Sequence, residues 1–198
     1  MTMRRLTMLG LAFGVMLSAG CRPPFAGARV DALGAAEAVV ASDGSSAGAA
    51  ALVASCAAGN TDFWAAKDRA HELLDEQDPL AADFALAVLE AGRQMESTLE
   101  TGDANEFAWW TVGRLAYHAG EAKAMAGDYP GAEAVMLAGP RRWQRDSYWR
   151  KYADHDALIA VVLVNLGRRT EAIKWLDQRP VLMPPADEVW EMLTGEAR

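Results

Sequence analysis

The side chains best suited to catalysis or metal binding are histidines, and their surroundings in the sequence are sparse. His71 lies one helical turn before Asp75, and His118 lies one turn before Glu121. Either pair supplies half of a metal site, but neither has a second histidine at the spacing that zinc sites use. We therefore expect helix-packing or surface histidines, and we predict no metal, no cofactor and no catalytic residue.

Two further reactive groups have structural explanations. The remaining histidine, His155, lies between two acids that are expected to stabilise the start of a helix through its macrodipole. Cys56 lies in the Ala-rich run Ala49–Ala58, with no basic residue nearby in the sequence to lower its pKa. We expect it to be a small buried apolar residue rather than a reactive thiol.

A basic and aromatic segment, Arg141–Tyr152, reverses the acidic character of the rest of the chain. Arginine, tryptophan and tyrosine are enriched at binding hot spots, so this segment is a candidate docking surface for an acidic partner or a lipid headgroup. Its aromatic side chains can alternatively pack in the core, which we favour for Trp149 and Tyr152. The predicted partner-binding residues are Arg141, Arg142, Trp143, Arg145 and Tyr148.

The first 20 residues have the pattern of an export signal. Arg4 and Arg5 precede an apolar stretch, Leu6–Leu17, that is short for a transmembrane helix. The following Ser18-Ala19-Gly20-Cys21 resembles the bacterial lipobox, although Ser18 replaces the preferred leucine. The resemblance implies a lipoprotein in which Cys21 carries a diacylglycerol and residues 1–20 are removed. The alternatives are an ordinary secretory signal and an uncleaved anchor.

The same resemblance implies a location and a membrane partner. The protein is expected to be lipid-anchored in the cell envelope and to face the periplasm. Because Arg22 is not an acid, the outer membrane is favoured in a Gram-negative cell. Without residues 1–20 the chain keeps 17 basic and 27 acidic residues, a formal charge of −10. This charge argues against nucleic-acid binding, which needs clustered Lys and Arg.

Composition divides the rest of the chain into a tether and one helical domain. Residues 21–48 are rich in Gly, Ala, Ser and Pro, and predict a flexible tether with a short helix over Val30–Val40. Residues 49–198 carry apolar stripes at the helical period and no alternation typical of strands. The predicted helices run from Leu80 to Leu99, Glu106 to Met125, Tyr129 to Ala138, Trp149 to the stop at Gly167, Thr170 to Gln178 and Pro184 to Leu193.

Two helix pairs repeat at an interval of 40 residues. Gly127, Ala132 and Pro140 recur as Gly167, Ala172 and Pro180; Gly120 recurs as Ala160, and Met136 as Leu176. We expect Gly127 and Gly167 to adopt a positive φ, and Ala132 and Ala172 to be buried where helices meet. Residues 61–101 fit a degenerate earlier hairpin.

The segment Gly120 to Ala132, with Gly127-Asp128-Tyr129, resembles the tetratricopeptide repeat, although the interval is 40 residues rather than 34. This resemblance implies an all-α fold of antiparallel hairpins stacked as a short solenoid that binds proteins or peptides without catalysis. The sequence therefore predicts a membrane-anchored interaction or assembly scaffold. A purely structural subunit of an envelope complex is the alternative, and an enzyme comes third.

Overall fold

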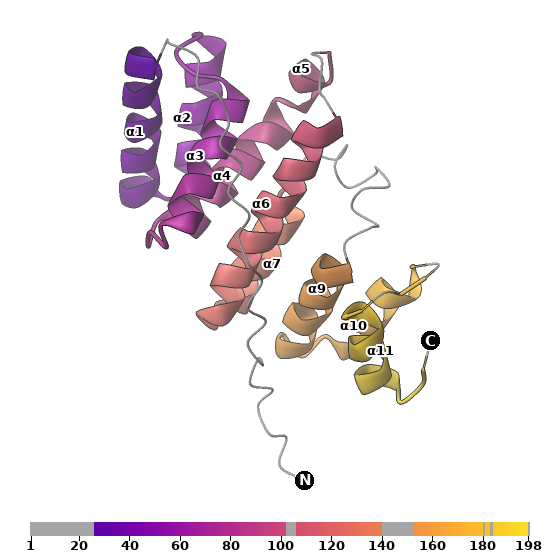
Figure 1. Cartoon of the computed structure of the whole chain (residues 1–198). Helices are drawn as coiled ribbons and strands as arrows, with labels where there is room; N and C mark the ends of the chain where they lie inside the picture. The colour runs from indigo at the N-terminus through magenta and orange to yellow at the C-terminus, as the bar shows by residue number, and fades with distance from the viewer. Residues whose placement is uncertain (1–25, 102–105, 140–152, 180, 183, 198) are drawn as a thin grey trace.

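The fold is all-α, as predicted. The computed structural model describes residues 26–101, 106–139, 153–179, 181–182 and 184–197, and these contain ten helices and no strand (Figure 1). The helices are α1 Ala26–Asp43, α2 Ser45–Ala57, α3 Phe63–Asp75, α4 Ala81–Gln94, α5 Glu96–Thr101, α6 Glu106–Met125, α7 Tyr129–Leu137, α9 Ala153–Asn165, α10 Arg169–Asp177 and α11 Ala186–Thr194.

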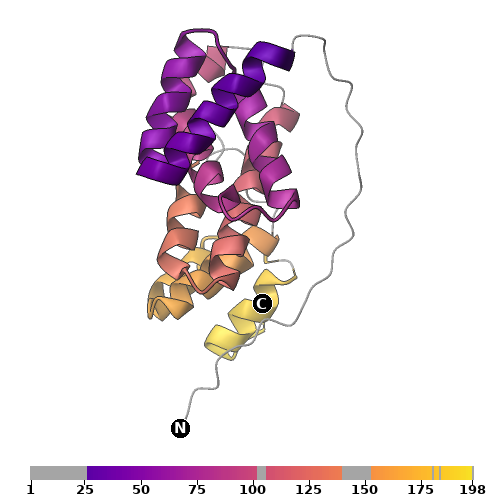
Figure 2. The same cartoon turned by 90° about the vertical axis from the view of Figure 1, so that its left-hand side faces the viewer.

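The helices form an array of hairpins. The pairs α1 and α2, α3 and α4, α6 and α7, and α9 and α10 each pack against one another. Hairpins are joined by contacts of α2 with α4, α4 with α6, and α7 with α9, while α11 packs on α9 and α10. In both views the array runs from α1 and α2 at one end to α9, α10 and α11 at the other (Figures 1 and 2).

The turns after α6 and α9 have the same hydrogen-bond pattern. The amide of Gly127 donates to the carbonyl of Ala124 at 3.0 Å, and the next amide, of Asp128, donates to that of Lys123 at 3.0 Å. The pair of bonds recurs at Gly167 and Arg168. This is the Schellman motif, which needs a left-handed residue and reverses the chain immediately after the helix. The glycine prediction is confirmed, because φ is +81° at Gly127 and +77° at Gly167.

The small residues of the two hairpins are buried as expected. Ala132 and Ala172 are fully buried, as are Met136 and Leu176 one turn later. A Cβ added at Gly120 would clash with the side chain of Met136, so glycine is needed there for α6 and α7 to approach closely. The burial prediction at both alanines is therefore confirmed.

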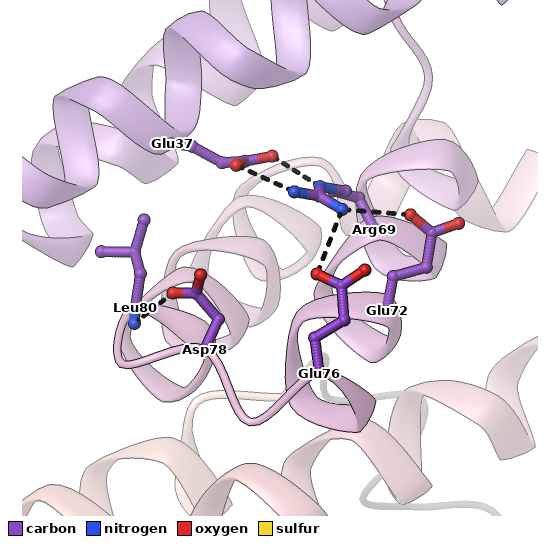
Figure 3. A network of polar contacts seen from close by, with 6 residues as sticks. All are labelled: Glu37, Arg69, Glu72, Glu76, Asp78 and Leu80. Carbon is purple, nitrogen blue, oxygen red and sulfur yellow. Dashed lines mark hydrogen bonds and ion pairs between the residues drawn. The ribbon is translucent and has the colours of Figure 1, made fainter.

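The earlier hairpin, α3 with α4, turns in the same way without glycine. Gln77 holds the left-handed position with φ +55°, and the turn repeats the two Schellman hydrogen bonds. The Asp78 carboxylate accepts a hydrogen bond from the Leu80 amide at 2.7 Å, and α4 begins at Ala81 (Figure 3). The single helix predicted from Leu80 to Leu99 is divided at Met95 into α4 and α5.

Residues 26–48, which the sequence assigned to a flexible tether, instead belong to α1 and α2. Ala36 and Val40 are buried, and Gly48 touches Val40 so closely that a Cβ would not fit. The Glu37 carboxylate also pairs with the Arg69 guanidinium of α3 at 2.7 Å (Figure 3). Alanine has the highest helix propensity, and small residues let helices pack tightly, so the same composition that resembles a linker forms a close hairpin.

Candidate functional site

The site residues predicted from the sequence lie outside the described part of the chain. They are Cys21 and the segment residues Arg141, Arg142, Trp143, Arg145 and Tyr148. Within the described residues, no helix is both long enough and apolar enough to cross a bilayer. The structure instead reveals a groove at the end of α7, where Leu137 lies four positions before the start of this segment at Arg141.

The groove lies between α7, α9 and α10 and has a volume of about 320 Å³. Each helix contributes residues three and four positions apart, which places them on one helical face. The floor and walls are apolar and the rim carries charges of both signs. The lining residues are Glu133, Met136, Leu137, Ile159, Val162, Leu163, Arg168, Glu171, Lys174, Trp175 and Gln178.

The groove reflects a difference between successive junctions of the array. The second helices of the two preceding hairpins, α4 and α7, pack against each other. The next two second helices, α7 and α10, pack less closely; both line the groove, and the Arg168–Glu133 ion pair joins them. Leu137, at the end of α7, is 41% exposed there although it is a large apolar residue.

One end of the groove is closed by an ion-pair cluster. The Arg168 guanidinium lies 2.6 Å from the Glu133 carboxylate of α7 and 2.7 Å from that of Glu171 in α10. The hydrogen bond from Arg168 is the main reason that the pKa of Glu171 is lowered. Arg168 therefore ties α7 to α10 while two carboxylates neutralise its charge.

The ammonium group of Lys174 forms no ion pair within 4 Å with a described residue, unlike the guanidinium of Arg168. Lys174 is exposed on α10, one turn beyond Glu171, and its positive charge helps to lower the pKa of that carboxyl group. The groove thus combines an apolar interior with a rim of two acidic and two basic side chains.

A buried cluster fixes the wall formed by Trp175. The indole Nε1 of Trp175 donates to the Asp156 carboxylate at 2.9 Å, and the Arg179 guanidinium donates to the same oxygen at 2.6 Å. The guanidinium also lies 5.1 Å from the centre of the Trp175 ring, a cation–π distance. Burial raises the pKa of Asp156, and the Arg179 hydrogen bond opposes this effect.

Sequence reasoning missed this cluster. The sequence predicts an acid near the start of a helix, and Asp156 does lie in the first turn of α9, but the residue is also only 4% exposed and its carboxylate is paired with Arg179. The available signal was its position on the apolar stripe of the predicted helix, between Tyr152 and Ala160. An acid in such a stripe needs a buried cation or several donors.

The histidines have different partners, although the charge of His118 acts on both His71 and His155. His71 Nε2 lies 3.2 Å from the carbonyl oxygen of Thr111, and His118 lies 3.7 Å from Glu121. His155 is 2% exposed, its ring meets that of Tyr117 edge-on at 5.8 Å, and burial lowers its pKa to about 3. Within the described residues, no group of three His, Cys, Asp or Glu side chains could hold a metal ion.

Cys56 is only half-buried, whereas full burial was expected. Burial, followed by the negative charge of Asp62, raises the pKa of the Cys56 thiol. A raised pKa leaves little thiolate near neutral pH, and the thiolate is the nucleophile, so the environment disfavours a reactive cysteine.

The comparisons with known proteins assign no family, so the function must be inferred from the local observations above. No family model, no curated protein and no solved structure matches this chain. Among the described features, the groove between α7, α9 and α10 has the attributes of a binding site: an apolar interior, a charged rim and a position between two hairpins.

Proposed function

We propose that this protein is a membrane-anchored envelope lipoprotein that acts as a protein–protein interaction or assembly scaffold. The observation that carries the scaffold role is the groove between α7, α9 and α10. The groove is concave, mostly apolar and bordered by charges, as binding sites usually are, and the partly exposed Leu137 offers a partner apolar surface to contact.

A tetratricopeptide-like solenoid is part of this proposal. In its favour, α4 and α7 each pack on the first helix of the next hairpin, and α11 closes the array as a terminal helix. The left-handed turn residues and the buried Ala132 and Ala172 recur in register. Arrays of this kind offer extended surfaces between repeats rather than a single enclosed active site.

The anchoring part of the proposal depends on the lipobox-like sequence ending at Cys21. We predict that Cys21→Ser moves the protein from the membrane fraction to the soluble periplasmic fraction, or stops its processing, because the thiol that accepts the lipid is absent. Fractionation followed by a carbonate wash measures this. A Ser variant that still sediments with membranes would show that another feature holds the protein there.

Affinity capture from the native envelope tests the scaffold role. Leu137→Lys places a charge in the groove at an exposed position, and Ala54→Lys makes the same change on an exposed face of α2 at the other end of the array (Figure 2). We expect a partner that is captured by the wild type and by Ala54→Lys and is lost with Leu137→Lys. Equal capture by all three would contradict the groove and favour a structural subunit that contacts its complex elsewhere.

A further inference from the structure

The stretch of chain between the proposed lipid anchor and the first helix is much shorter than the sequence predicts. A tether over residues 21–48 would let the domain move up to about 95 Å from Cys21. Because α1 begins at Ala26, only residues 22–25 separate it from Cys21. The five Cα-to-Cα steps from 21 to 26 span at most about 18 Å, so the start of α1 lies within that distance of the anchor.

The first hairpin also has an unusual surface for so acidic a chain. Among the exposed residues from Ala32 to Asn60, Asp43 is the only charged one, and the others are Ala, Gly, Ser and Asn. Glu37, the other acid in this range, pairs with Arg69 of α3 at 2.7 Å (Figure 3). The next helix, α3, by contrast exposes several carboxylates. The end of the array that carries the anchor is therefore the end with few surface charges.

The outer face of α1 consists of Gly34, Ala35, Ala38, Ala41 and Ser42, which are all exposed and lie on one side of the helix. The opposite side is buried where α1 packs on α2 and α4. In Figure 2 the first hairpin faces the viewer, and no other described helix covers it. This face is thus both uncharged and open to a partner outside the array.

We infer that the outer face of α1 lies against the surface of the phospholipid bilayer, so that the array extends away from the membrane toward α9, α10 and α11. This inference rests on the proposed lipid anchor at Cys21 and adds the orientation of the domain. An uncharged face can approach an anionic bilayer closely, whereas exposed carboxylates are repelled by it. The groove between α7, α9 and α10 is then at the end away from the bilayer.

Fluorescence quenching by lipids that carry a nitroxide on the headgroup tests this inference. The lipidated mature chain is purified from membranes and placed in vesicles of phosphatidylethanolamine and phosphatidylglycerol. In a Cys56→Ala background, the fluorophore is attached through Ala38→Cys on α1 or through Met192→Cys, at an exposed position of α11. We expect quenching at least about threefold stronger at position 38, because the short link keeps α1 near the headgroups.

A longer link provides the matched control. A Gly-Ser segment as long as the predicted tether, inserted after Phe25, should abolish the difference between the two positions, while the helical circular-dichroism signal stays unchanged. Equal quenching at both positions with the native link, or stronger quenching at position 192, would overturn the inference. A difference that survives the longer link would also overturn it, because the short link would not be the cause.

Flotation of the same vesicles separates this inference from the proposed function. A chain that floats with the vesicles but shows equal quenching keeps its lipid anchor and loses only the proposed orientation. A chain that does not float has no anchor, and both the orientation and the lipoprotein part of the proposed function would then be wrong.

Discussion

The hairpins α6/α7 and α9/α10 share one backbone frame and differ in what they bury. In the first, Leu115, Ala116 and Val135 are fully buried apolar residues. At the positions 40 residues later, the second hairpin carries His155, Asp156 and Trp175, and the last two belong to the ion-pair cluster with Arg179. The same turn and alanine contacts therefore support both an apolar core and a polar one.

The polar version of the hairpin is the one that forms the groove. Trp175 lines it, and the indole of Trp175 donates a hydrogen bond to Asp156, which is also paired with Arg179. Buried ion pairs stabilise a fold weakly at best, because desolvation offsets their attraction, but they fix the geometry of the groups they contact. We therefore expect the α9/α10 hairpin to gain little stability from the Asp156–Arg179 pair, whose main effect is to fix the position of the Trp175 side chain.

The largest expected effect comes from breaking the buried pair. Arg179→Met leaves the Asp156 carboxylate buried without its cation, and we expect a loss of about 3–5 kcal/mol in the free energy of unfolding. Asp156→Leu with Arg179→Met replaces the pair by apolar side chains and should recover at least half of the loss. Urea unfolding measures both. If the double variant were as unstable as the single one, the pair would not be the source of the cost.

Larger side chains at the buried alanines test whether the hairpins α6/α7 and α9/α10 pack in the same way. Ala132→Leu and Ala172→Leu insert a larger side chain at fully buried contacts, and each should cost about 1–3 kcal/mol. Ala134, which is exposed on α7, the helix in which Ala132 is buried, provides the control. Ala134→Leu should change the melting temperature little. A large cost at one buried alanine and none at the other would contradict the 40-residue repeat.

The pH dependence of stability distinguishes His155 from its counterpart, Leu115. Because burial lowers the pKa of His155 from 6.5 to about 3, the unfolded chain binds a proton there that the folded chain does not. Stability from this group is present above pH 6.5 and declines as the pH falls, by about 1.5 kcal/mol between pH 6.5 and 5.

The substitution His155→Leu copies the first hairpin and should remove this part of the pH dependence. His118→Gln is the control and should retain most of it, because the charge of His118 contributes less to the lowered pKa of His155 than burial and Arg179 do. Unfolding in urea at pH 6.5 and pH 5 gives both values. An unchanged pH dependence in His155→Leu would show that His155 is not the buried group that resists protonation.

The sequence predicted the repeated frame because its determinants are local. A left-handed turn favours glycine at Gly127 and Gly167, and a close contact favours alanine at Ala132 and Ala172, so a fixed interval identifies both. The composition of residues 26–48 wrongly predicted a flexible tether in place of α1 and the start of α2, because glycine and alanine occur both in linkers and in tightly packed helices. Gly48 is such a case, since it contacts Val40.

The groove could not be predicted from the sequence. Its existence depends on how α7, α9 and α10 pack, which is set by whole helices rather than by any motif. Leu137 and Trp175 follow ordinary apolar stripes, and Lys174 is an ordinary exposed lysine until its neighbours are known. The predicted docking segment, Arg141–Tyr152, lies outside the described residues, although it begins only four positions after Leu137.

Photo-crosslinking in the intact envelope tests the central claim, that the groove holds the partner, most directly. A photoreactive amino acid replaces Leu137 in one variant and the exposed Ala54 of α2 in the other. The account predicts a discrete crosslink to one partner protein from position 137 and none from position 54. Crosslinks of equal yield from both positions, or none from position 137, would contradict it.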